Sequence, residues 1–131
     1  TFIGLWAVGR LPGAFALPAG IGDLLVGGLA LVAGWLALRR DDLGFAAVNA
    51  WNWFGAFDLV VAVSTGFLTS PGPYQLIALD RPNLLITSYP LSMVPLFAVP
   101  LSFILHAIVW MKLKDVAMVR EDSDGAEVAL T

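Results

Sequence analysis

"GIGDLLVGGLALVAGWLAL", residues 20–38, is the stretch that decides the fold. Its single charged side chain is Asp23, and the run is followed at once by Arg39 and Arg40. A helix rises about 1.5 Å per residue, so this stretch is long enough to cross a hydrocarbon core about 30 Å thick. The sequence therefore predicts a transmembrane span over residues 20–40.

The composition of the whole chain also indicates lipid surroundings. Of the 131 residues, 59% are hydrophobic and only 13% are charged, whereas soluble domains are about 45–50% apolar and about 25% charged. The chain has no cysteine, which excludes disulfides, thiolate metal sites and cysteine nucleophiles. The formal charge of −3 comes from an acidic C-terminal end, and the near-neutral body argues against nucleic acid as a partner.

Two further apolar blocks, residues 43–69 and 91–113, are long enough to span. Between them, residues 71–90 are partly amphipathic and aromatic, which predicts an extracytoplasmic segment with a short helix lying in the membrane interface. Residues 115–131 are polar and predict a disordered acidic tail. The predicted fold class is an all-α polytopic transmembrane helix bundle, with one helical domain at residues 1–114.

The start of the chain predicts interrupted helices. Residues 1–10 are apolar but too short to span, which predicts the end of a truncated helix. The next stretch, "RLPGAFALPAG", is also apolar, yet it contains four residues that break regular helix, Pro12, Gly13, Pro18 and Gly20. We therefore expect an interfacial or re-entrant connection there, whose backbone groups must be satisfied by the protein itself.

The basic residues predict the orientation. Five of the seven gather at the turn after the first span and toward the C-terminal end, namely Arg39, Arg40, Lys112, Lys114 and Arg120. The opposite side has only Arg10 and Arg81. By the positive-inside rule, the turn and the C-terminus are expected in the cytoplasm of a multi-pass protein of the bacterial inner membrane.

Small residues indicate where helices approach one another. Gly27, Ala30 and Gly34 in the first span and Gly55 in the second are the predicted packing positions, because close backbone contact drives helix association in lipid. They would serve packing within the bundle or docking of another subunit. In the last span, three prolines at an interval of five predict a kinked helix or, alternatively, a gating hinge: Pro90, Pro95 and Pro100.

Polar side chains inside the predicted spans are the candidate functional residues: Asp23, Asn49, Asn52, Asp58, Ser102 and His106. Counting along the helices puts Asp58 about 15 Å from the outer surface, level with Ser102. The same count places His106 level with Asn49 and Asn52 and predicts contact with one of them. Since Asp58 lies on the opposite side of its helix from Asn49, residues 43–69 are expected to form the central helix.

The two membrane carboxyl groups allow several interpretations. An ionised carboxylate near the midplane is costly, and no cation occurs at the depth of Asp58. Asp58 is therefore expected to be neutral and bonded to a backbone carbonyl or to Thr65, to relay protons or ions, or to pair with a group outside this chain. Asp23, just after the predicted helix start, is expected to cap that helix.

His106 is the chain's one histidine. It is predicted to be a hydrogen-bonded packing residue, and axial ligation of a haem or a chlorophyll-type pigment is the alternative. The sequence contains no metal-ligand constellation, nucleophile–base pair or phosphate loop. We therefore expect no catalytic activity and no metal or other cofactor, the haem or pigment alternative aside.

Three stretches carry a family resemblance: "LPGAFALPAGIGDLLVGGLA", "WNWFGAFDLVVAVSTG" and "YPLSMVPLFAVPLSFILHAIV". They resemble an uncharacterised family of bacterial polytopic membrane proteins with the pattern LPxxFAxPAGxGD, WNxxGxxDL and VPLxxxLH. The resemblance covers residues 11–113. It implies further helices before Thr1, no established activity, and four polar motif positions, Asp23, Asn52, Asp58 and His106.

The leading functional prediction is a non-catalytic packing and binding subunit of a larger membrane assembly. Its partners would be the lipid bilayer and either other membrane subunits or the missing N-terminal helices. The first alternative is a proton- or ion-coupled small transporter component that uses Asp23 and Asp58. The second is an electron-transfer or light-harvesting subunit that binds haem or (bacterio)chlorophyll through His106.

Overall fold

The computed structural model describes residues 1–39 and 41–128, and it describes side chains as far as residue 120. The chain is 76% helical, with no strand in the described part. Three helices are long and apolar enough to cross a membrane, Gly13–Ala37, Asp42–Thr69 and Val94–Arg120. The predicted all-α transmembrane bundle with three spans is confirmed.

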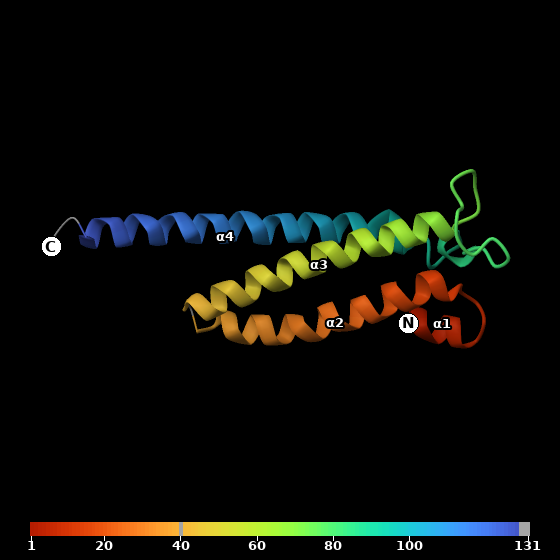
Figure 1. The fold of residues 1–131 in the computed structure, drawn as a ribbon, viewed down its shortest axis with the longest axis horizontal. Coiled ribbons are helices and arrows are strands. Elements are labelled where there is room, and N and C mark those ends of the chain that lie inside the picture. Colours follow the sequence, from red (N-terminus) through yellow and green to blue (C-terminus); the bar gives the residue numbers. More distant parts are fainter. Residues whose placement is uncertain (40, 129–131) are drawn as a thin grey trace.

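The three long helices form an elongated bundle (Figure 1). Helices α2 (Gly13–Ala37) and α3 (Asp42–Thr69) are antiparallel and joined by a tight turn. Helix α4 (Val99–Val128) returns alongside α3 and continues beyond the α2–α3 turn. Because α3 packs against both α2 and α4, it occupies the central position that its two polar sides predict.

Helix α2 begins earlier than predicted. It starts at Gly13 after an extended Pro12, and it continues through Pro18 and Gly20. The predicted interfacial connection over this stretch is therefore wrong. Pro18 lies in the second turn, where its missing N–H affects one carbonyl only. Gly20 is used for a close contact rather than a break, since a Cβ atom there would lie 2.7 Å from Ile3 Cγ1.

The first residues form a short helix, α1 (Phe2–Ala7), that folds back on α2. Gly9 has a φ of 71°, a left-handed conformation that favours glycine and allows this reversal. The main hydrophobic core lies where α1, the beginning of α2 and the later loop meet. Its buried members are Leu11, Phe15, Ala16, Ala19 and Ile86.

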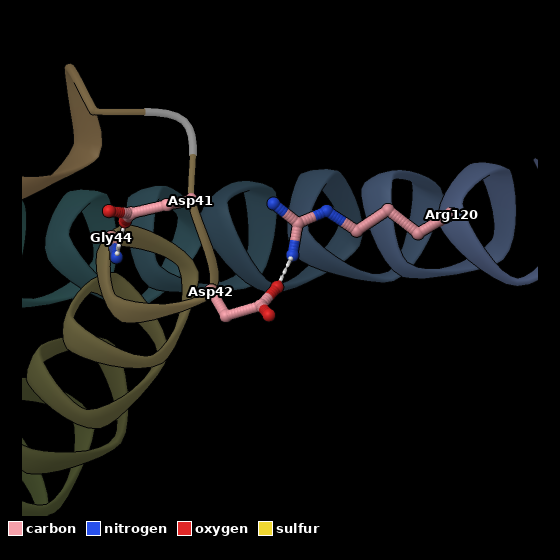
Figure 2. Close-up of polar contacts among 4 residues, drawn as sticks. All are labelled: Asp41, Asp42, Gly44 and Arg120. Carbon is pink, nitrogen blue, oxygen red and sulfur yellow. Dashed lines mark hydrogen bonds and ion pairs between the residues drawn. The ribbon is translucent and has the colours of Figure 1, made fainter. Parts of the chain in front are cut away.

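The α2–α3 turn is held by two acidic residues (Figure 2). Asp41 caps α3, because its Oδ1 accepts a hydrogen bond from the Gly44 amide at 2.8 Å. Asp42 forms an ion pair with Arg120 of α4. Gly44 allows the close approach of α2, since a Cβ atom there would lie 2.5 Å from the Leu36 carbonyl oxygen. The turn therefore fastens all three long helices at this end.

Between α3 and α4 the structure has turns and one short 3₁₀ helix, η1 (Leu85–Thr87), in place of the predicted interfacial helix. Prolines repeatedly remove backbone donors from this segment, which prevents a longer helix. Asn83 anchors the segment instead. It is fully buried, its backbone N–H donates to the Thr69 carbonyl at 2.8 Å, and its side-chain oxygen accepts from the Ile86 amide at 3.3 Å.

The last span begins with a π-helical segment, η2 (Val94–Ala98), that leads into α4. Pro95 lies inside η2 and Pro100 lies in the first turn of α4, so both remove donors here, and the π segment continues the backbone past them. Pro90 lies in the turn before this span. The kink expected from these prolines stays a prediction.

Helix α4 runs to Val128, although a disordered tail is predicted from residue 115. No proline or glycine interrupts residues 115–124, and Arg120 is tied to Asp42, so the helix is supported beyond the apolar span. The predicted tail thus differs from the structure over residues 115–128. Residues 129–131, its end, lie outside the described residues.

Candidate functional site

Two hydrogen bonds inside the spans join Asn52 of α3 to His106 of α4. Asn52 Oδ1 lies 2.8 Å from His106 Nδ1, and Asn52 Nδ2 donates to the His106 carbonyl oxygen at 3.2 Å. Asn52 is only 4% exposed. Because an amide oxygen only accepts hydrogen bonds, the Nδ1 atom of His106 must carry a proton. The Asn52 side chain thus makes two hydrogen bonds to His106, one to its ring and one to its backbone carbonyl. We call this pair of bonds the clasp.

Gly55 and Trp51 complete this site. A Cβ atom at Gly55 would lie 2.5 Å from His106 Cε1 and 2.8 Å from Nε2, so the imidazole edge rests against the α3 backbone. The Trp51 ring lies 5.5 Å from the His106 ring, centroid to centroid, and its Nε1–H donates to the Val26 carbonyl of α2 at 2.9 Å. We call Trp51, Asn52, Gly55 and His106 the His106 cluster, which connects all three long helices.

The His106 cluster is suited to hold helices together. Asn52 takes up one edge of the imidazole, and the other edge faces Gly55. A haem or chlorophyll-type macrocycle would need one ring nitrogen aimed at open space, and this geometry does not favour that. Asn49, the alternative partner of His106, is half-buried and makes no side-chain hydrogen bond with a described residue.

The second site brings two carboxyl groups together across α2 and α3. The Asp58 carboxyl lies against Gly22, so closely that a Cβ atom at position 22 would overlap it. Asp23 is the next residue along α2, so the Asp58 carboxyl lies beside the turn of α2 that carries Asp23. Within the described part of the chain, Asp58 makes no hydrogen bond. The hydroxyl of Thr65, its expected partner, donates instead to the carbonyl of Val61 at 2.8 Å.

Asp23 does not cap a helix as expected. Since α2 begins at Gly13, Asp23 lies in the middle of that helix, where the amides are already bonded. Asp23 is one of the residues that line a cavity of about 700 Å³ between α2, α3 and the beginning of the last span. Ser102 of α4 lines the same cavity, as do Leu59 and Val63 of α3. Asp58 is not among the residues that line this cavity, and the expectation that Ser102 lies level with Asp58 stays a prediction.

The small residues of α2 divide into two groups. Gly27 and Gly34 were both expected at helix contacts, yet a Cβ atom added at either position would have no neighbouring atom within 4 Å. They therefore face away from the rest of the described chain. Ala30 is half-buried. The glycine that α2 places against α3 is Gly22, which sequence reasoning missed. Its position directly before Asp23, in "GIGD", is the signal that could have found it.

Sequence reasoning also missed the contacts at the α2–α3 turn and the bridging role of Trp51. The spacing of Asp41 and Gly44 is typical of a side-chain cap and could have indicated the helix start. Tryptophan is frequent at the membrane interface, so the sequence alone favours an anchoring role for Trp51. Its bond to Val26 depends on how α2 and α3 pack, and the local sequence has no signal for it.

These features define an all-α membrane protein built from three apolar spanning helices. The chain belongs to a family described as a domain of unknown function (DUF8737), whose model matches residues 1–114. Neither a curated protein nor a solved structure matches the chain. The predicted membership of an uncharacterised family is confirmed, and this family brings no established activity.

Proposed function

We propose that this protein is a non-catalytic packing and binding subunit of a larger membrane assembly, and that α2 is its docking helix. The observation that carries the proposal is the outward face formed by α2 and its C-cap residue, made of Leu24, Gly27, Leu31, Gly34 and Leu38. The three leucines recur every seven residues and are 62%, 78% and 79% exposed. Both glycines face open space. This face lies on the side of α2 opposite Gly22 and its contact with α3.

A heptad of large and small residues suits a second helix better than it suits lipid. Leucine side chains act as knobs, and glycines leave holes that admit a neighbouring backbone. Glycine within a helix also costs about 0.5–1 kcal/mol relative to alanine. Lipid tails give no compensation specific to glycine, whereas close packing of a partner helix does. The proposed partner is therefore a transmembrane helix of another subunit.

Cross-linking from single introduced cysteines tests the proposal, and residues 1–131 contain no cysteine to interfere. Single variants Gly27→Cys, Leu31→Cys and Gly34→Cys are labelled with a benzophenone maleimide and irradiated in native membranes. The photoactivated benzophenone inserts into C–H bonds, so the partner needs no cysteine. Matched controls are Leu25→Cys and Val32→Cys, which are exposed on another side of the same helix. We expect discrete adducts from the first group only. Equal labelling without adducts at all five positions would show that this face contacts lipid.

We further propose that the protein lies in the bacterial inner membrane with the α2–α3 turn and the C-terminal end in the cytoplasm. The turn and the far end of α4 lie on the same side of the bundle (Figure 1). Arg39, Lys112, Lys114 and Arg120 support this orientation by the positive-inside rule. A C-terminal alkaline phosphatase fusion should be inactive and a C-terminal fluorescent protein fusion should fluoresce. The reverse pair of results would invert the orientation.

Proton- or ion-coupled transport is a second candidate, and one observation favours it. Asp23 lines a cavity of about 700 Å³, and the Asp58 carboxyl of α3 lies against Gly22, the residue before Asp23. Intramembrane carboxyl groups next to a cavity are a frequent feature of proton and ion pathways. Reconstituted Asp58→Asn should lose pH-coupled flux while staying folded. If wild-type vesicles carry no such flux, this candidate is discarded.

A further inference from the structure

The cavity beside Asp23 has the size and lining of a small-molecule site. Its volume is about 700 Å³, within the range of about 300–1,000 Å³ typical of ligand pockets. Phe15 of α2, Leu59 and Val63 of α3 and Val99 of α4 contribute apolar walls. Such a lining favours a largely apolar ligand.

The size of the cavity also limits what can occupy it. A helix about 10 Å wide that rises about 1.5 Å per residue would fit only about six residues into that volume. A bare metal ion does not fit the lining either. Within the part of the chain that the structure describes, no three His, Cys, Asp or Glu side chains form a group that could hold one.

The charge in the wall selects the ligand further. Asp23 lines the cavity, and the Asp58 carboxyl lies against Gly22, the residue before Asp23. Neither a lysine nor an arginine lies among the lining residues that the structure describes. Two neighbouring carboxyl groups in a low-dielectric setting are stabilised by a cation placed between or beside them. A bound ammonium group would also donate charge-assisted hydrogen bonds to Asp23 and could donate to the Ser102 hydroxyl.

We propose that this cavity binds a lipophilic amine, an organic cation with an apolar body. The ammonium group lies at Asp23, with Ser102 as a second hydrogen-bond acceptor. The apolar body packs between Phe15, Leu59 and Val63. Asp23 lies one turn before Gly27, at the edge of the outward leucine and glycine face. None of the residues of that face lines the cavity, so amine binding is measured separately from docking.

Two probes that differ in one group test this assignment. The full chain is placed in phosphatidylcholine nanodiscs, and binding of 1-naphthylmethylamine and 1-naphthylmethanol is measured by equilibrium dialysis against empty nanodiscs. Both probes have the same ring system, but only the amine is cationic. We expect one amine site per chain, with an affinity about ten-fold or more above that of the alcohol.

Variants locate the site. Asp23→Asn should weaken amine binding about ten-fold and leave alcohol binding unchanged. Asp80→Asn is the matched control, because Asp80 is exposed in the loop after α3 and outside the cavity, and it should change neither probe. Val63→Trp fills the cavity without a change of charge, and it should abolish binding of both probes.

Three results would overturn the proposal. Equal affinity of the two probes would make the cavity a site for neutral apolar chains, such as a lipid tail. An amine preference that survives Asp23→Asn would place the ammonium group elsewhere. Binding that survives Val63→Trp would place the whole ligand elsewhere, and this variant decides the matter if Asp23→Asn does not fold. None of these measurements requires flux, so they are separate from the transport test.

Discussion

The Nδ1 atom of His106 lies 2.8 Å from the Oδ1 atom of Asn52, and this contact ties α4 to α3 inside the apolar part of the bundle. A second bond, from Asn52 Nδ2 to the His106 carbonyl oxygen, makes the pair directional. Apolar side chains do not define how two helices align in lipid, because a leucine packs as readily against a lipid tail as against a helix. The pair therefore sets the register between the two helices.

Replacing Asn52 should destabilise the bundle. We expect Asn52→Leu to lower the free energy of unfolding by about 1–2 kcal/mol, since it removes two hydrogen bonds and leaves the Nδ1 proton of His106 without its acceptor. The measurement is denaturant unfolding in mixed micelles. The control is Asn49→Leu, at a half-buried position one turn earlier without a side-chain hydrogen bond to a described residue, and it should change stability much less. Equal losses from both variants would contradict the clasp.

Adding one methyl group should have opposite effects at two glycines. Gly55→Ala would press a Cβ atom against the His106 ring, so we expect a loss of about 1–3 kcal/mol. Gly27→Ala meets no neighbour in the described chain and should stabilise the purified protein by about 0.5–1 kcal/mol. Thermal unfolding of both variants in the same detergent tests this pair. A Gly55→Ala protein as stable as wild type would show that the ring can move aside.

The His106 cluster leads us to expect no specific haem binding. One imidazole edge is bonded to Asn52 and the other faces Gly55, so axial ligation would require the clasp to open. Absorption spectra of the purified protein should have no Soret or near-infrared band, and haem titration should give the same spectra for wild type and His106→Ala. A Soret band in wild type that disappears in His106→Ala would move the protein to the cofactor-binding class.

The ion pair between Arg120 and Asp42 should support the part of α4 beyond the membrane span (Figure 2). Arg120 also lies over the Phe45 ring, 5.6 Å from its centroid. We expect Arg120→Ala to speed amide hydrogen exchange around residues 115–120 and to leave the His106 cluster protected. High salt should produce part of the same change in wild type, because exposed ion pairs are screened. Asp115→Ala is the control. Unchanged exchange in Arg120→Ala would show that the helix needs no such support.

Sequence reasoning succeeded for the properties that depend on a single helix, such as its length and the depth of its residues. Length and hydropathy were enough to predict the three spans, and counting residues placed His106 level with Asn52. The same count could not choose between Asn49 and Asn52, because both lie on one side of the helix about 60° apart. The choice depends on the rotation of α4 about its own axis, which packing determines.

Errors arose where packing outweighs local preference. Pro12, Pro18 and Gly20 suggested a broken segment, yet α2 runs through Pro18 and Gly20, because α1 folds against it and Gly20 receives Ile3. The segment after residue 114 suggested disorder, yet α4 continues with Arg120 held by Asp42. In both cases the prediction relied on the intrinsic helix propensity of the segment. A tertiary contact, which has a larger effect than propensity, determined the structure instead.

The sequence by itself determined that this is a helical membrane protein, that its chain has three spanning helices, and which polar residues lie within the spans. Those properties follow from the free energy of placing each side chain in lipid, which depends on composition and length alone. The tertiary structure decided that Asn52 clasps His106, that Asp58 lies against Gly22, and that the leucines and glycines of α2 face outward. Those depend on which side of each helix meets its neighbour, and that is set jointly by close contacts and directional hydrogen bonds from several helices.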